Sequence, residues 1–194
     1  MKKGHIRNIR KKLLSRGWST LECLTYDYKT ADGSWEEQTR EVYDRGNGAA
    51  ILLYNAAKGT VVLTRQFRMP TYVNGNEDGM MVEACAGLLD SEDPAECIRR
   101  EVEEETGYSI GKVKQVMKTY MSPGSVSEIL YLFTGEYNQQ MKTGEGGGAE
   151  GETENIEVLE IAFQKAMDMV ATGEIKDAKT ILLLQYAALN GLFT

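Results

Sequence analysis

The chain has 194 residues, of which 42% are apolar and 26% are charged, a composition typical of globular proteins. This length corresponds to one domain, or to one domain with a small appendage. A formal net charge of −7 argues against non-specific nucleic-acid binding, which needs a basic surface. Because His5 is the only histidine, we expect neither a histidine-based triad nor a histidine-ligated zinc site. Chemistry must then rest on carboxylates, Lys, Arg, Tyr or Ser.

The N-terminal residues 1–14 are basic, and no apolar segment long enough for a signal peptide follows them, so we expect none. No other run approaches the length of a membrane span. Cys23, Cys85 and Cys97 lack the spacing of metal or redox motifs. Their pattern predicts reduced, mostly buried thiols in a cytoplasmic protein.

We predict a small antiparallel β hairpin region for residues 1–46. The first 17 residues are expected to form a strand or a short helix, and the alternation of apolar and polar residues predicts strands at 20–28 and 35–43. Asp32 and Gly33 are a hairpin turn signal between those strands. Trp18 and Trp35 are predicted to be core residues, which is the default for isolated aromatic side chains.

Residues 47–194 predict the main domain, with further strands around one central helix and two helices at the end. The predicted strands are 49–54, 60–67, 80–86, 113–121, 129–137 and 156–163, and the late helices are 166–172 and 178–192. Residues 70–78 are polar and rich in Gly and Asn, which predicts a loop. This order favours a mixed α/β (α+β) sandwich, in which a mixed sheet lies between helices.

Basic and acidic residues interrupt the predicted strands. Arg65 and Arg68 lie three residues apart, so in an extended chain they point to opposite faces. Either one of them contacts a phosphate while the other pairs with an acid, or both are solvated. Glu83 stands in an otherwise apolar strand, which predicts an exposed edge position or an ion pair with Arg68 or Arg100.

The central helix has capping signals at both ends. Asp93 can cap its N-terminus, Pro94 suits the first helical position, and Gly107 is a natural left-handed stop.

Acidic side chains share one face of this helix. Glu101 and Glu105 are four residues apart, and Glu104 lies beside them. Three crowded acids repel one another, and a hard cation such as Mg²⁺, Mn²⁺ or Ca²⁺ would remove that conflict. The alternative is a solvated acidic face.

Residues 139–155 form the least ordered stretch of the sequence. It contains a Gly-Gly-Gly run at 146–148 and several acids, and we see no apolar anchor, so we expect it to be mobile. Two interpretations stay open: a solvated acidic loop, or an active-site lid that carries a catalytic acid.

The run RREVEEETGY resembles the signature of the Nudix hydrolases, Arg-Glu-U-x-Glu-Glu-x-Gly-U with U apolar. Glu92 lies seven intervening residues before Arg100, as the pattern requires. One position departs from it, because only four residues separate Gly87 from Glu92, one fewer than expected. Either the loop is shortened, or Asp93 replaces the expected Glu.

Longer runs, among them REVYDRGNGAAILLYN, YMSPGSVSE and TGEIKDAKT, resemble the GDP-mannose pyrophosphatase branch of this family, which is close to the ADP-ribose pyrophosphatases. The resemblance implies a Nudix α-β-α sandwich and a Mg²⁺-dependent enzyme, with Mn²⁺ as the alternative ion. It implies hydrolysis of GDP-mannose to GMP and mannose 1-phosphate. It also implies a homodimer in which the N-terminal region completes the partner's site.

Site residues follow from the same resemblance, position by position. The implied metal ligands are the carbonyl of Ala86 with Glu101, Glu104, Glu105 and Glu154. The implied catalytic acids are Glu101, Glu105, Glu152 and Glu154. The implied substrate contacts are Trp18, Thr39, Arg40, Glu41, Arg68, Ala86, Gly87, Leu88, Glu128 and Lys179. The chain is two residues longer than the pattern between the glycine run and Ile156, so Glu152 and Glu154 compete for the role of loop acid, and we favour Glu154.

Two alternatives to GDP-mannose hydrolysis remain. The first is the same chemistry on ADP-ribose or another nucleotide sugar, since the acidic helix holds metal and diphosphate rather than the base. The second is a non-catalytic nucleotide-sugar sensor, because a fold does not by itself imply a function. The intact acids argue against the sensor.

Overall fold

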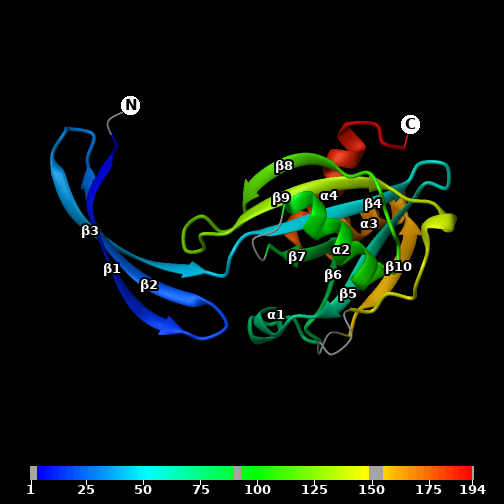
Figure 1. Ribbon diagram of the computed structural model, residues 1–194, viewed down its shortest axis with the longest axis horizontal. Helices are drawn as coiled ribbons and strands as arrows, with labels where there is room; N and C mark the ends of the chain where they lie inside the picture. Colours follow the sequence, from blue (N-terminus) through cyan, green and yellow to red (C-terminus); the bar gives the residue numbers. More distant parts are fainter. Residues whose placement is uncertain (1–3, 90–92, 149–154, 194) are drawn as a thin grey trace. The chain divides into compact units, whose positions relative to one another are not determined.

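The computed structural model describes residues 4–89, 93–148 and 155–193 (Figure 1). By its internal contacts the chain divides into two compact units. The first comprises Met1–Asn47 with Tyr120–Ile129, and the second comprises Gly48–Thr119 with Leu130–Thr194.

The first unit is a three-stranded antiparallel sheet in the order β1-β2-β3. Its strands are β1 Ile6–Arg16, β2 Thr20–Lys29 and β3 Trp35–Asp44. The turn between β2 and β3 places Gly33 at a φ of +89°, which a residue without a Cβ adopts at little cost. The antiparallel region expected at the N-terminus is thus confirmed, with β1 as its third strand.

The prediction that Trp18 is a core residue is wrong. Its side chain lies in the short connection between β1 and β2, and the residue is 97% exposed. A connection between strands lies at the protein surface, so an aromatic side chain there is not packed into a core. Trp35 is half-buried, with the Arg7 guanidinium 4.0 Å from the centre of its ring.

The segment Tyr120–Ile129 joins the first unit through backbone contacts. Tyr43 donates its N–H to the carbonyl of Ser125 at 2.8 Å, and Ser127 donates to the carbonyl of Tyr43 at 3.1 Å. The domain boundary predicted between residues 46 and 47 stays a prediction.

The second unit is built on a mixed seven-stranded sheet. Its strands are β4 Gly48–Asn55, β5 Thr60–Phe67, β6 Met80–Glu83, β7 Cys85–Leu88, β8 Lys114–Tyr120, β9 Ile129–Glu136 and β10 Glu157–Ala162. The main path runs β10-β5-β4-β9-β8, while β6 pairs with β5 and β7 pairs with β4. The β4–β9 pair is parallel, and the other pairs with a resolved register are antiparallel.

Helices cover both faces of this sheet. They are α1 Met69–Val73, α2 Pro94–Thr106, η1 Gln139–Met141, α3 Phe163–Thr172 and α4 Ala178–Leu189. In Figure 1, α2 crosses in front of the sheet, and α3 and α4 lie behind it. The predicted mixed sheet between helices is confirmed. None of the described helices is both long enough and apolar enough to cross a lipid bilayer.

The central strand β4 has buried apolar side chains on both of its faces. Its residues Ala49, Ile51 and Leu53 join a core with Ile98 and Val102 of α2. The intervening side chains point to the opposite face, and they are also fully buried. A strand of this kind needs a helix on each side.

Two local predictions differ from the structure. The segment predicted as a loop at 70–78 begins with the short helix α1, whose first turn tolerates Pro70 because that position needs no backbone donor. The strand predicted at 80–86 is divided into β6 and β7. The division falls at Ala84, whose N–H leaves the sheet ladder and donates to the Thr180 hydroxyl at 2.6 Å.

Candidate active site

The helix α2 has the ends that its sequence predicts. The Asp93 carboxylate accepts hydrogen bonds from the backbone N–H groups of Ala95 and Glu96 at 2.9 and 3.4 Å. Gly107 ends the helix at a φ of +71°. Both predicted caps are confirmed, and they set the two ends of the helix.

Glu105 is the most deeply buried acid of the predicted set, with only 3% of the residue exposed. The Ala86 backbone N–H of β7 donates to its Oε2 at 3.3 Å. Burial raises the pKa of the adjacent Cys85 thiol well above its usual value, and the charge of Glu105 raises it further. Cys85 is therefore a neutral thiol that can serve Glu105 only as a hydrogen-bond donor.

Glu101 lies against the backbone of the same strand. A Cβ added to Gly87 would come within 2.1 Å of the Glu101 carboxyl carbon. The strand can approach this carboxylate only because residue 87 has no side chain. Glu101 and Glu105, one turn apart on α2, therefore both face the Ala86–Gly87 backbone.

Arg100 neutralises part of this acidic face. Its Nη1 lies 3.0 Å from Glu101 Oε1 and 2.9 Å from Glu104 Oε2. The side chains of Glu101 and Glu104 are 16% and 34% exposed, so neither pair is fully screened by water.

The donors on this face suit a hard divalent cation. Carboxylate oxygens and a main-chain carbonyl are the ligands that Mg²⁺ and Mn²⁺ take in proteins. Within residues 4–89, 93–148 and 155–193, no three His, Cys, Asp or Glu side chains already surround one point. The fit thus rests on the chemistry of the donors, and on a β7 backbone that leaves space for the Glu101 carboxylate.

Replacing Gly87 with alanine should weaken metal binding with little effect on folding. The added methyl group displaces the end of the Glu101 side chain, which is flexible, whereas the backbone can stay in place. We expect Mg²⁺ affinity, measured by titration calorimetry, to fall about 10- to 100-fold, and the melting temperature to change by only a few degrees.

Gly111→Ala is the matched control, because a Cβ at residue 111 meets no described atom within 4 Å. Equal Mg²⁺ affinities for Gly87→Ala and the wild-type protein would show that Glu101 does not bind the ion.

A second group of predicted residues meets on β6. Arg68 follows β5 and binds both carboxylate oxygens of Glu83, with Nε 2.7 Å from Oε1 and Nη2 3.1 Å from Oε2. Lys179, in the first turn of α4, donates to the same Oε2 at 2.5 Å. The predicted ion pair between Glu83 and Arg68 is confirmed, and the exposed-edge alternative is wrong because Glu83 is only 4% exposed.

Arg65 takes a different direction from Arg68, as the strand spacing predicts. Its guanidinium pairs with Asp78 at 3.4 Å and with Glu157 of β10 at 3.3 Å. These partners are more than half exposed, so the pairs contribute little to stability. Arg68, with its buried partner, is the stronger candidate for a functional role.

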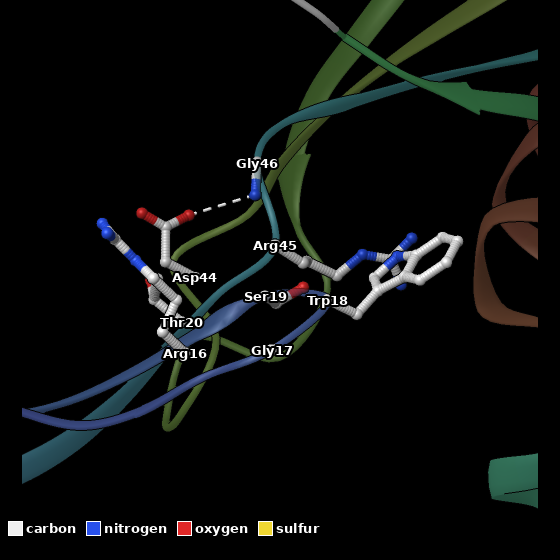
Figure 2. A pocket seen from close by; sticks show the side chains of 8 residues that line it. All are labelled: Arg16, Gly17, Trp18, Ser19, Thr20, Asp44, Arg45 and Gly46. Carbon is white, nitrogen blue, oxygen red and sulfur yellow. Dashed lines mark hydrogen bonds between the residues drawn. The ribbon is translucent and has the colours of Figure 1, made fainter.

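Trp18 lines an open pocket of about 440 Å³ in the first unit (Figure 2). Figure 2 shows the Trp18 and Arg45 side chains extending toward the same side of the pocket. Arg45 pairs with Glu128, whose side chain is 14% exposed, at 3.6 Å. The structure thus brings Glu128 into the unit that carries Trp18 and gives it a cationic partner.

Thr39, Arg40 and Glu41 follow one another on β3. The Thr39 hydroxyl shares a hydrogen bond of 3.2 Å with the Thr25 hydroxyl, and Arg40 Nη1 donates to the Thr39 carbonyl at 2.8 Å. All three residues are exposed, which is compatible with contact to another molecule. Leu88, at the end of β7, accepts a hydrogen bond from the Cys97 thiol through its carbonyl at 3.3 Å.

The expectation that residues 139–155 lack an apolar anchor is wrong for their described part. Met141 of η1 packs against the core cluster beside α2. The following backbone docks on the end of α2, where Gly147 donates to the Glu105 carbonyl at 2.9 Å and Gly148 donates to the Glu104 carbonyl at 3.2 Å. The last carbonyls of a helix lie beyond its regular hydrogen-bond ladder, and glycine lets another backbone reach them.

Three predicted acids lie outside the described residues: Glu92, Glu152 and Glu154. The choice between Glu152 and Glu154 therefore stays open, as does the effect of the short spacing after Gly87. Asp93, the alternative to Glu92, uses its carboxylate as the cap of α2.

Sequence reasoning missed two contacts of the predicted residues. The link between Glu83 and Lys179 spans 96 positions, and its one signal was an acid in an apolar strand. The pair of Arg45 and Glu128 had no signal, because each residue lies in a connection between predicted strands, where charges are common.

Comparison with protein families identifies the class of this chain. The model of the NUDIX domain matches residues 44–184, and the chain belongs to this family. The model described as the GDP-mannose pyrophosphatase NudK N-terminal domain matches residues 5–43, which contain all of β1 and β2 and most of β3.

Curated relatives extend the similarity over nearly the whole chain. A GDP-mannose pyrophosphatase of Pectobacterium atrosepticum is 56% identical over 185 residues, 95% of this chain and 95% of the relative. One of Yersinia enterocolitica is 55% identical over 187 residues, 96% of this chain and 97% of the relative. One of Yersinia pestis is 56% identical over 95% of this chain and 92% of its own length.

Proposed function

We propose that this protein hydrolyses GDP-mannose to GMP and mannose 1-phosphate with the help of Mg²⁺, and that Mn²⁺ can replace it. The observation that carries the proposal is the extent of the similarity. Identity of 55–56% with GDP-mannose pyrophosphatases covers the N-terminal sheet as well as the NUDIX domain. A shared acidic helix alone would support only diphosphate chemistry.

Glu101, Glu104, Glu105 and the Ala86 carbonyl would hold the ion, together with the loop acid Glu154. When bound, the ion supplies positive charge to the diphosphate and makes a water molecule more acidic. The buried Glu105 and the approach of β7 to Glu101 support this assignment.

Side chains of the protein would accept the proton of the attacking water and bind the phosphate groups. Water forms a bond to one phosphorus, the bridging P–O bond breaks, and Glu154, in preference to Glu152, accepts the proton of the water. Arg68 and Lys179 bind phosphate oxygens and stabilise the charge that develops on them. Gly87 and Leu88 follow the proposed metal ligand Ala86 on β7, and we assign their backbone to substrate contact.

We also propose a homodimer in which the first unit completes the partner's site through Trp18, Thr39, Arg40 and Glu41, with Glu128 as a further substrate contact. The exposed Trp18 ring is a surface on which a purine can stack. Ile9 and Leu13 of β1 are each 52% exposed, and burial of such apolar side chains against a second copy would favour association. Sedimentation as a monomer at micromolar concentration would contradict the dimer.

The cytoplasmic location also belongs to the proposal, and it rests on the three free cysteines.

A substrate panel tests the proposed reaction. Purified protein with Mg²⁺ should release GMP and mannose 1-phosphate from GDP-mannose, and chelation of the ion should stop the release. ADP-ribose and UDP-glucose serve as comparisons because they share the diphosphate and differ in base and sugar. Turnover of ADP-ribose without turnover of GDP-mannose would overturn the substrate assignment and leave the diphosphate chemistry intact.

A further inference from the structure

Glu83 is a buried acid to which the proposed reaction assigns no role. It ends β6, is 4% exposed, and receives three hydrogen bonds from two cations. Arg68 occupies both of its oxygens, and Lys179 shares Oε2 with Arg68. One carboxylate thus joins the end of β5, the end of β6 and the first turn of α4.

Lys179 is held from a second side as well. Its Nζ lies 3.1 Å from Asp177 Oδ1, and the other Asp177 oxygen accepts the Thr180 N–H at 3.0 Å. The Thr180 hydroxyl in turn accepts the Ala84 N–H at 2.6 Å. The first turn of α4 is therefore bonded to the residue that directly follows Glu83.

The shared carboxylate brings two positive charges close together. Arg68 Nη2 and Lys179 Nζ lie 3.1 and 2.5 Å from the same oxygen, so these nitrogens are separated by less than about 6 Å. Two cations so close repel each other unless an anion lies between them. A phosphate group, with oxygens directed to several sides, is an anion that two adjacent cations can bind together.

Charge balance keeps the cations protonated. Burial alone would lower the pKa of Lys179, but the charges of Glu83 and Asp177 raise it above its usual value. Burial alone would raise the pKa of Glu83, but the hydrogen bonds from Arg68 and the charge of Lys179 lower it. Without Glu83, Lys179 would stay buried and would keep, among these four groups, its ion pair with Asp177.

We propose that Glu83 is a positioning residue for diphosphate binding: it does not contact the substrate, but holds Arg68 and Lys179 side by side as a paired binding site for one phosphate. The inference rests on the proposed function, which assigns both cations to the substrate. Glu83 ends β6 and precedes Ala86 of β7 by three residues, at most roughly 10 Å of chain, so the cation pair and the implied metal ligand Ala86 lie on consecutive strands.

Glu83→Gln tests the role because it keeps the shape and removes the charge. We expect the KM for GDP-mannose to rise about 10- to 100-fold, the worth of hydrogen bonds to a charged group, and kcat to fall less. The alkaline limb of the pH profile of kcat/KM should move to lower pH, because Lys179 loses a charge that raises its pKa while staying buried.

Glu160→Gln is the matched control. Glu160, on β10, is a more exposed acid that also has a lysine partner, since Lys58 lies 3.4 Å away, and Tyr108 donates to it at 3.2 Å. It has no contact with the proposed substrate groups among these partners. Its replacement should lower stability less than Glu83→Gln does, because the Glu160 side chain is 32% exposed, and it should leave the KM and the pH profile unchanged.

Two further variants keep the test decisive. Glu83→Asp retains the charge on a shorter side chain and should recover part of the affinity. In a Lys179→Gln background, Glu83→Gln should raise the KM by a smaller factor, because one of its two cations is already gone. If Glu83→Gln folds and leaves the KM and the pH profile unchanged, Glu83 is structural only. If Glu83→Gln does not fold, a wild-type KM in folded Glu83→Asp leads to the same conclusion, because the shorter side chain moves the carboxylate away from the two cations that it is proposed to position.

The wild-type assay separates this inference from the proposed function. If wild-type protein hydrolyses ADP-ribose and leaves GDP-mannose intact, the substrate assignment fails. The variants measured with ADP-ribose then still decide the role of Glu83, because both substrates contain a diphosphate. Hydrolysis of no diphosphate ester would overturn both proposals.

Discussion

Glu105→Gln should reduce kcat for GDP-mannose about 10³-fold and leave the protein folded. Glu105 is the buried member of the acid set, and a neutral amide is a much weaker ligand for a hard cation than a carboxylate. The amide oxygen of glutamine can still accept the hydrogen bond from Ala86, so β7 and α2 should keep their contact. Stopped assays of GMP release measure the activity, and thermal unfolding measures the fold.

Glu103→Gln on the same helix is the control, because Glu103 is exposed and turns away from β7. It should retain wild-type turnover, although its neutralisation changes the net charge of α2 as much as Glu105→Gln does. Turnover near that of the wild type in Glu105→Gln would remove Glu105 from the metal site. Equal losses in the two variants would mean that helix charge, and not one ligand, is what matters.

Gly107→Ala should destabilise the protein by roughly 3 kcal/mol or more. Two costs add at this position. The left-handed φ of +71° disfavours any residue with a Cβ, at roughly 1 kcal/mol. The Cβ would also lie 2.2 Å from the carbonyl oxygen of Gly144, which is backbone and cannot rotate aside.

Gly173→Ala separates the two costs. Gly173 ends α3 at a φ of +77°, and a Cβ there meets no described atom within 4 Å. It should cost only the left-handed contribution, about 1 kcal/mol. Urea unfolding of both variants gives the comparison, and equal losses of free energy would show that the Gly144–Gly148 backbone is not docked on α2 in solution.

The docking of this backbone links stability to the site. Thr143 and Gly144 donate to the Gly107 carbonyl at 2.8 and 3.1 Å, and Gly147 donates to the Glu105 carbonyl at 2.9 Å. The segment that leads toward the predicted loop acids is thus hydrogen-bonded to Gly107 and to Glu105, which is a predicted metal ligand. Gly107→Ala should therefore lower kcat as well as stability, whereas Gly173→Ala should lower stability alone.

Local signals were sufficient for α2 and β5. The limits of α2 follow from a capping carboxylate, a proline and a left-handed glycine, which act over one turn of helix. The predicted strand at 60–67 matches β5 at both ends, because its apolar run is bounded by turn residues. The short helix α1 escaped prediction because five residues are too few for a period to show.

By itself, the sequence determined the family signature, the arrangement of a mixed sheet between helices, and the spacing of Glu101, Glu104 and Glu105 on one helical face. These features depend on short-range periodicity and on residue types, which a single chain displays directly. Only the tertiary structure decided which distant groups meet. It placed Arg68 and Lys179 on Glu83, exposed Trp18, and docked the glycine run on the end of α2. Such contacts join residues tens of positions apart, and they depend on how strands and helices pack, to which no local pattern is sensitive.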